Sequence, residues 1–175
     1  ASSIVLACRP RPEDAPATTR RALVAALKAE LPEALRRLMQ GAVAKAGAMG
    51  VPMCIAIVDP SGTLVQFLRM DGAALLSVNI SQDKAYTAVS FGMATHEWHD
   101  FIKNDPPLLH GIVHTPRLVV FGGGYPIKID GVLVGGIGVS GGHYTHDMEV
   151  AQAALAAAGL VLGRAGGSSL PHAQL

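Results

Sequence analysis

Residues 125–139 read Tyr-Pro-Ile-Lys-Ile-Asp-Gly-Val-Leu-Val-Gly-Gly-Ile-Gly-Val, and this stretch decides the fold. It consists of two apolar runs, residues 125–129 and 132–139, on either side of Asp130-Gly131. An Asp-Gly pair between two apolar runs is the strongest short-range signal for a two-residue β-hairpin turn. The sequence therefore predicts an antiparallel pair of strands in the second half of the chain.

A second hairpin is predicted upstream of the first. The apolar run at residues 53–58 suits a buried strand, and residues 63–70 form its partner. Between them, residues 59–62 (Asp-Pro-Ser-Gly) are a cluster of turn-forming residues. Two hairpins give an antiparallel sheet, which excludes the doubly wound parallel folds that bind nucleotides.

A long helix is expected before the first hairpin. Residues 18–48 carry leucines at three- and four-residue spacing, which is the pattern of an amphipathic helix. Pro32 lies inside this stretch, and proline breaks or kinks a helix, so one bent helix or two separate helices are possible.

Three further helices are predicted over residues 73–91, 95–103 and 145–162, the last two capped by Thr95 and Thr145. The prolines and glycine of residues 104–117 indicate a loop with at most one helical turn. Residues 118–121 are expected to form a short strand.

The 175 residues correspond to a single domain at 18–163, with an N-terminal arm at 1–17 and a flexible tail at 164–175. Half of the residues are hydrophobic and only 15% are charged, which favours a homo-oligomer in which part of the apolar surface is covered. The two cysteines do not indicate a disulfide framework, and both are expected to be inert.

Charge and hydropathy limit the partners of the chain. The formal net charge of +1 gives no basic face for nucleic acid. No apolar run reaches the roughly 18 residues of a membrane-spanning helix. A cytoplasmic location is expected, although a signal peptide already removed before Ala1 would leave the same sequence.

Six blocks of sequence, in this order, are similar to the GlcG/HbpS family, which includes the C-terminal domain of PduO-type proteins. The similarity extends over about residues 20–160. The blocks are Ile55-Ala56-Ile57-Val58-Asp59 with Gly62 and Leu64, Arg69-Met70-Asp71-Gly72-Ala73, Lys84-Ala85 with Thr87-Ala88, Gly122-Gly123-Gly124-Tyr125-Pro126-Ile127, Gly131 with Val134-Gly135-Gly136-Ile137-Gly138-Val139-Ser140-Gly141, and Asp147 with Val150-Ala151 and Ala153-Ala154-Leu155.

The resemblance implies an α+β, profilin-like fold in which helices pack around a five-stranded antiparallel sheet. It also implies homo-oligomers, here expected to be tetramers or octamers. Several members of the family bind haem. Other relatives belong to aromatic catabolic pathways and include proteins resembling hydroxylaminobenzoate lyases, so the family fixes the fold better than the chemistry.

Histidines are the first candidates for chemistry, because six of the seven lie between residues 96 and 146. His96 and His99 are three residues apart and are expected on one helix face, and His143 and His146 lie where the last helix begins. With Glu97, these side chains are predicted general acids and bases. The set His96, His99 and His143 is the predicted ligand group if a divalent metal is bound.

The candidate ligand-binding residues surround these histidines. Arg117 and the backbone of Gly141-Gly142 are predicted to hold a carboxylate. Lys84 is a candidate to anchor an acidic ligand or to form a Schiff base. The sequence favours a third role for it, a salt bridge that closes a helix onto the hairpin. Trp98 and Tyr125 either stack on a flat ligand or belong to the core or an interface.

Residues 136–141 (Gly-Ile-Gly-Val-Ser-Gly) formally match the dinucleotide-binding fingerprint. The fingerprint requires a second parallel strand with an acidic residue about 20 residues further on, and this chain ends before such a strand. We therefore expect a tightly packed strand that leads into a turn.

Two functional hypotheses follow from the sequence. The first is an enzyme that acts on an aromatic or related carboxylic acid by lyase or imine/amine chemistry, with histidine as general acid and base. The alternative is a protein that binds haem or another tetrapyrrole without turnover. The histidine enrichment favours the enzyme.

Overall fold

Both predicted hairpins form, and they pair with each other into one antiparallel sheet. A computed structural model describes residues 17–129 and 131–160, and their side chains from residue 32 on. The strands are β1 (Cys54–Val58), β2 (Leu64–Arg69), β3 (Gly124–Ile129) and β4 (Val132–Ser140), in the order β2-β1-β4-β3. The N-terminal arm, the tail from residue 164 and Asp130 of the second turn lie outside the described residues.

The turn between β3 and β4 has two residues, because Ile129 pairs directly with Val132. Gly131 has a φ of 79°, in the left-handed region where glycine is favoured, as an Asp-Gly hairpin turn requires. Local turn chemistry alone therefore predicted this part of the fold.

The prediction of five strands is wrong for the described part of the chain, which contains four. The expected strand at residues 118–121 does not form. The backbone N–H of Val119 donates a hydrogen bond to the Thr87 hydroxyl at 3.0 Å, so this segment is held by a helix side chain instead of a strand.

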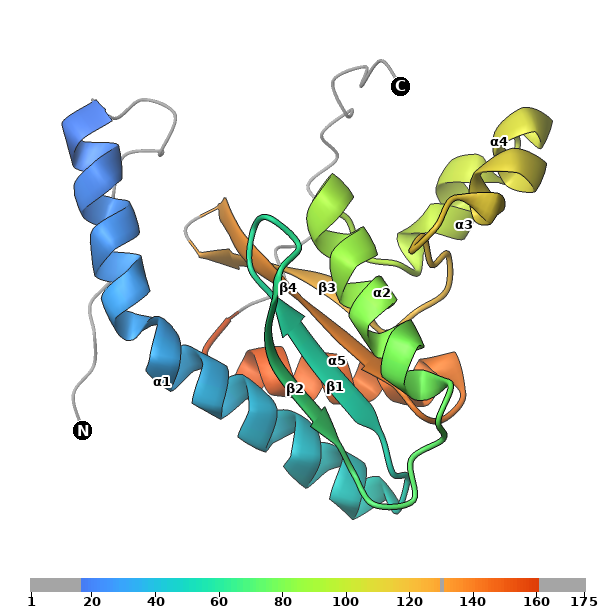
Figure 1. Cartoon of the computed structure of the whole chain (residues 1–175), viewed down its shortest axis with the longest axis horizontal. Helices are drawn as coiled ribbons and strands as arrows, with labels where there is room; N and C mark the ends of the chain where they lie inside the picture. Colours follow the sequence, from blue (N-terminus) through green and yellow to red (C-terminus); the bar gives the residue numbers. More distant parts are fainter. Residues whose placement is uncertain (1–16, 130, 161–175) are drawn as a thin grey trace.

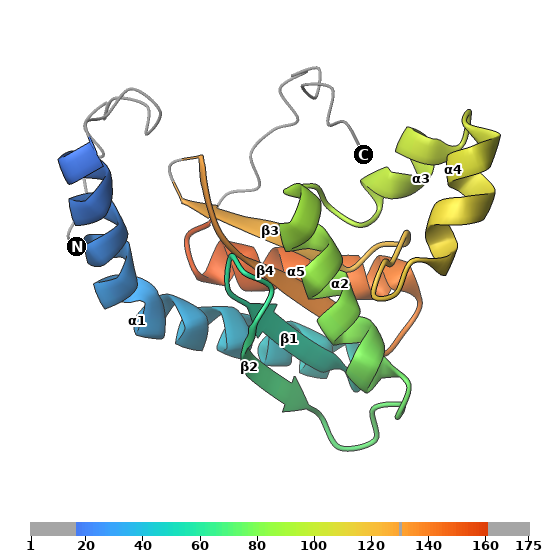
Figure 2. The same ribbon diagram turned by 45° about the horizontal axis from the view of Figure 1, so that its top comes forward.

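The helices are α1 (Ala17–Met49), α2 (Ser77–Phe91), α3 (Glu97–Ile102), α4 (Pro106–Gly111) and α5 (Tyr144–Ala157), and a 3₁₀ turn covers Ile112–His114. Helices α1 and α5 pack together on one face of the sheet, and α2 covers the other face (Figures 1 and 2). In both views α3 and α4 lie to the right of α2, on the side away from α1. None of the described helices is long and apolar enough to cross a membrane.

The structure resolves the alternatives that the sequence left open for the helices. The first helix is continuous through Pro32, and Figure 1 shows that it changes direction part-way along its length. The region 104–117 is more helical than predicted. Asp105 caps α4 by accepting from the N–H of Leu108, and the two prolines occupy the first helical positions, where a missing N–H costs nothing.

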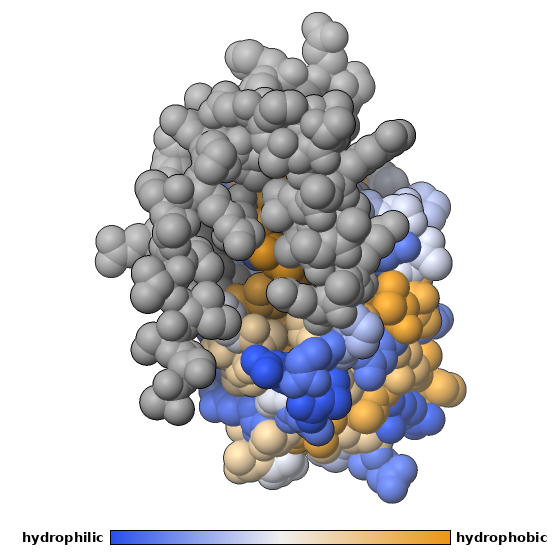
Figure 3. Space-filling view, turned by 90° about the vertical axis from the view of Figure 1, so that its left-hand side faces the viewer, coloured by the Kyte–Doolittle hydropathy of each residue, from blue (hydrophilic) through white to orange (hydrophobic). Residues whose placement is uncertain are grey.

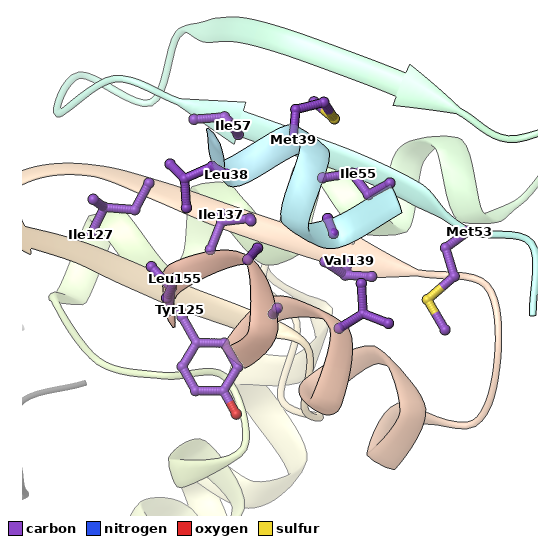
Figure 4. Close-up of a cluster of buried hydrophobic side chains, with 14 of the residues drawn as sticks. Leu38, Met39, Met53, Ile55, Ile57, Tyr125, Ile127, Ile137, Val139 and Leu155 are labelled. Carbon is purple, nitrogen blue, oxygen red and sulfur yellow. The ribbon is translucent and has the colours of Figure 1, made fainter. Parts of the chain in front are cut away.

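The main core lies between the sheet and the α1–α5 pair (Figure 4). Ile55, Ile57, Ile137 and Val139 project from β1 and β4 toward these helices, and each is at most 1% exposed. Burying an aliphatic side chain of this size stabilises the fold by roughly 1.5–3 kcal/mol. The core therefore fixes the sheet against α1 and α5 and positions the start of α5.

On the opposite face, α2 approaches β4 unusually closely. A Cβ at Gly136 would lie 2.5 Å from the carbonyl oxygen of Ala85, and a Cβ at Gly138 would overlap the carbonyl of Ser81. The glycines of the apparent dinucleotide fingerprint thus make room for the backbone of a helix. This confirms the prediction of a tightly packed strand.

Candidate functional site

A buried ion pair joins α2 to the first turn of α5. Nζ of Lys84 lies 2.6 Å from Oδ2 of Asp147, and the two side chains are 0% and 2% exposed. The same ammonium group donates to the carbonyl oxygen of Val139 at 3.0 Å. The salt bridge favoured from the sequence therefore forms, but its partner belongs to α5 and not to the first hairpin.

The loop before β3 closes over this pair. Gly123 has a φ of 116°, and a Cβ there would lie 2.8 Å from Nζ of Lys84. The ring of Phe121 lies 4.8 Å from the same nitrogen, within the range of a cation–π contact. Because Lys84 is enclosed and already paired, it is not placed to anchor a ligand as the sequence had also suggested.

Burial sets the electrostatics of the pair. Loss of solvent lowers the pKa of Lys84 and raises the pKa of Asp147, and their mutual attraction opposes both shifts. The N–H of Gly142 donates to Oδ1 of Asp147 at 3.2 Å and further favours the carboxylate. The predicted anion-binding backbone around Gly141-Gly142 is thus occupied by a carboxylate of the chain itself.

The two histidines near α5 have different surroundings. His143, not Thr145, is the N-cap of α5: its Nδ1 accepts from the N–H of Thr145 at 3.4 Å and lies 2.9 Å from the Thr145 hydroxyl. An imidazole that accepts through Nδ1 carries its proton on Nε2 when neutral. His146 is half-buried, with its ring packed against Gly142.

The other predicted group is centred on Tyr125. The ring of His96 lies 5.5 Å from that of Tyr125, whose hydroxyl accepts from Nε2 of Gln152 at 3.0 Å. Burial raises the pKa of Tyr125. Glu97 is committed to the backbone, because its Oε2 accepts from the N–H of Ala94 at 2.9 Å.

Trp98 is a core residue and does not stack on an open site. It is 1% exposed and packs edge-on between Phe91 and Phe101. Its Nε1 and the Nδ1 of His96 are buried atoms without a hydrogen-bond partner among the described residues.

The predicted metal-ligand set of His96, His99 and His143 is not brought together. His96 turns toward Tyr125, whereas the side chain of His99 is 69% exposed, so the two do not share a face. His143 lies at the start of α5. It is more than two helical turns before Gln152, the α5 residue that contacts Tyr125 beside His96. Across residues 17–129 and 131–160, no group of three or more His, Cys, Asp or Glu side chains is placed to hold a metal ion.

Arg117 is also separate from the histidines. It lies in the loop after the 3₁₀ turn and contacts α2, where its guanidinium carbon is 3.7 Å from the centre of the Tyr86 ring. Its Nε donates to Oδ1 of Asp83 at 3.0 Å. The structure thus divides the predicted site into three places: the start of α5, the surroundings of Tyr125, and the outer side of α2.

The sequence did not reveal an apolar cavity of about 680 Å³ at the end of the sheet that carries both hairpin turns. Figure 3 views the molecule from this side, where apolar surface is partly visible. Most of the cavity's lining side chains are hydrophobic, and the sequence pattern alone does not distinguish such residues from residues of the core. The lining residues include Ala34, Leu35, Leu38, Ile57, Val65, Ile127, Ile129, Leu133, Val134 and Leu160, with Asp59 and Ser61 at one end.

Residues 32–156 match the family model described as haem-degrading protein HbpS-like. The chain belongs to this family. The HbpS-like chain is 41% identical over 124 residues to the corrinoid adenosyltransferase PduO of Salmonella typhimurium, and it spans only 37% of that relative. It is 38% identical over 124 residues to an uncharacterized 15.0 kDa protein of Citrobacter freundii, of which it spans 87%. The protein GlcG of Escherichia coli is 36% identical over 86 residues.

Solved structures agree with this family assignment. A structure described as a PduOC–haem complex is 40% identical with a TM-score of 0.67, and the match covers 71% of this chain and 91% of that one. A structure of HbpS is 32% identical with a TM-score of 0.64, and the match covers 71% of this chain and 86% of that one. The mixed α/β fold with an antiparallel sheet is therefore shared with these relatives.

Proposed function

We propose that the HbpS-like chain binds haem or a closely related tetrapyrrole, without turnover, in the apolar cavity beside α1. The cavity carries this proposal. Its volume of about 680 Å³ lies within the roughly 300–1,000 Å³ of small-molecule sites, and its lining suits a flat apolar ring. The likeness to a protein solved with haem supports the choice of ligand.

The lining fits the macrocycle better than the iron. Among the described residues that line the cavity there is no His, Cys, Met or Tyr, the side chains that ligate haem iron. Affinity would come from burial of the ring against Leu35, Leu133 and Val134, at about 25 cal/mol per Å² of apolar surface. Iron-free protoporphyrin should then bind about as well as haem.

The enzyme hypothesis has less support. The relatives do not favour a lyase acting on aromatic acids, and the histidines it needs lie in different surroundings. His143 caps a helix, His96 packs on Tyr125 and His99 faces solvent. For these reasons the binding alternative replaces the enzyme as the proposed function.

Titration with haem and with protoporphyrin tests the proposal, followed by the Soret band and by porphyrin fluorescence. Ala34 lines the cavity, so Ala34→Trp should fill it and weaken both ligands at least tenfold. Gln40 is an exposed residue of the same helix outside the cavity, and Gln40→Trp should change the affinity less than twofold.

Equal binding by the two variants would place the ligand elsewhere. A loss of haem binding but not of protoporphyrin binding in His143→Ala or His146→Ala would show that a histidine near α5 ligates iron and that the cavity is not the site. Absence of any Soret change would refute the function itself.

We also propose that the chain assembles as the tetramer or octamer that the resemblance implies. Leu75 and Leu76, directly before α2, are 76% and 70% exposed. Two adjacent leucines that are so open to water favour contact with a second copy of the chain.

A further inference from the structure

Arg117 is held in a conformation that is costly for its backbone. Among the described residues it is the one non-glycine residue with a positive φ, at 68°. Its carbonyl oxygen accepts from the Thr87 hydroxyl at 2.8 Å, and that hydroxyl in turn accepts from the N–H of Val119. Helix α2 therefore fixes the backbone that carries this side chain.

The guanidinium group of Arg117 is fixed as well. It stacks on Tyr86 and donates through Nε to Asp83. An arginine has five N–H donors, and the four on Nη1 and Nη2 have no hydrogen-bond partner among the described residues. A guanidinium that is already ordered loses little entropy when it binds a planar anion through two parallel hydrogen bonds.

The Arg117 side chain borders an open polar cavity of about 630 Å³ at the surface. Ser61 and Thr63 of the β1–β2 turn present hydroxyl oxygens that can accept hydrogen bonds, because Ser61 donates its own proton to Asp59 and Thr63 donates to Ser61. Asn79 and Gln82 of α2 supply amides. Gly62 and the ring of Tyr86 also line this cavity, and they are in close contact, because a Cβ at Gly62 would lie 2.7 Å from that ring.

We propose that this cavity binds a small carboxylic acid that carries additional hydroxyl groups. The carboxylate pairs with the terminal nitrogens of Arg117, and the hydroxyl groups meet Ser61, Thr63 and Asn79. The proposal goes beyond the tetrapyrrole site: the two cavities share the turn at Ser61, but either would stand without the other.

The charges at the site give no preference for a doubly charged ligand. The carboxylate of Asp83 borders the cavity and offsets the charge of Arg117, so the two side chains together contribute no net charge. A monoanion needs only the hydrogen bonds of the guanidinium. The neutral pair does not draw a dianion more strongly than a monoanion, and two parallel hydrogen bonds from a guanidinium suit a planar carboxylate, so inorganic phosphate should bind no more tightly than a carboxylate.

The test is an NMR titration of the guanidinium signal of Arg117 with glycerate and with butyrate as the matched ligand without hydroxyls. Glycerate should shift the signal saturably, with butyrate at least fivefold weaker. Arg117→Lys should weaken glycerate about tenfold, and Arg36→Lys, a change at an exposed α1 arginine, should have no effect. Binding of haem by Arg117→Lys should be unchanged, which separates this proposal from the tetrapyrrole site.

Asn79 is exposed and makes no side-chain hydrogen bond to a described residue, so Asn79→Ala should fold normally. It should weaken glycerate about threefold and leave butyrate unchanged. Equal binding of glycerate and butyrate, or no saturable shift in the wild-type chain, would overturn the proposal. A preference for inorganic phosphate over glycerate would overturn the choice of a carboxylate.

Discussion

Lys84 and Asp147 are 63 positions apart in the sequence, yet their side chains meet at 2.6 Å with almost no access to solvent. The pair links α2, on one face of the sheet, to α5, on the other, past the end of β4. Both partners belong to the sequence blocks that carry the resemblance to the family, and this contact gives those two blocks a structural role in the chain.

Removal of one partner should be far more harmful than removal of both. Lys84→Met would leave the carboxylate of Asp147 buried and unpaired, which typically costs about 3–5 kcal/mol. The double variant Lys84→Met/Asp147→Leu leaves no unpaired charge and should recover much of this loss. Urea unfolding of the four proteins measures the coupling, and strictly additive effects would contradict it.

Substitution of glycine by alanine should have opposite effects at Gly138, where α2 packs closely on β4, and at Gly47, which has open space around it. Gly138→Ala would place a methyl group against the backbone carbonyl of Ser81 and should destabilise the chain by about 1–3 kcal/mol. Gly47 lies in α1 with open space around it, so Gly47→Ala should stabilise the helix by up to about 1 kcal/mol. Thermal unfolding measures both, and a tolerated Gly138→Ala would disprove the packing described for α2.

The thiol of Cys54 should be unreactive in the folded chain. It is fully buried in β1, and this burial raises the pKa of the thiol, so the reactive thiolate is scarce at neutral pH. In a Cys8→Ser variant, where Cys54 is the remaining cysteine, a disulfide reagent such as DTNB should react only after unfolding. Rapid reaction under native conditions would mean that β1 opens readily.

Exposure of Leu75 and Leu76 predicts that the assembly depends on them. Changing both to Glu should shift the mass measured by light scattering toward the monomer, since two buried carboxylates oppose the contact. The matched control is Leu64→Glu in β2, which changes another exposed leucine. A monomeric wild-type chain would refute the proposed oligomer.

The sequence predicted those parts of the fold that depend on neighbouring residues. The turn at Gly131 and the glycines of β4 have local signatures, so both hairpins and the packed strand were found. The candidate site was predicted less well, because closeness in sequence was taken for closeness in space. His96 and His99 are three residues apart but point into different surroundings. The partner of Lys84 and both cavities depend on long-range packing that no local pattern reports.

The apolar cavity and the main core share part of their lining: Leu38 and Ile57 belong to both. A ligand in that cavity would therefore pack directly against side chains of the main core and extend it. At a concentration one hundred times its dissociation constant, such a ligand adds about 2.7 kcal/mol to the free energy of unfolding. In a cell, this coupling would let the supply of the ligand govern how long each copy of the chain survives proteolysis, so that the amount of protein follows the amount of ligand.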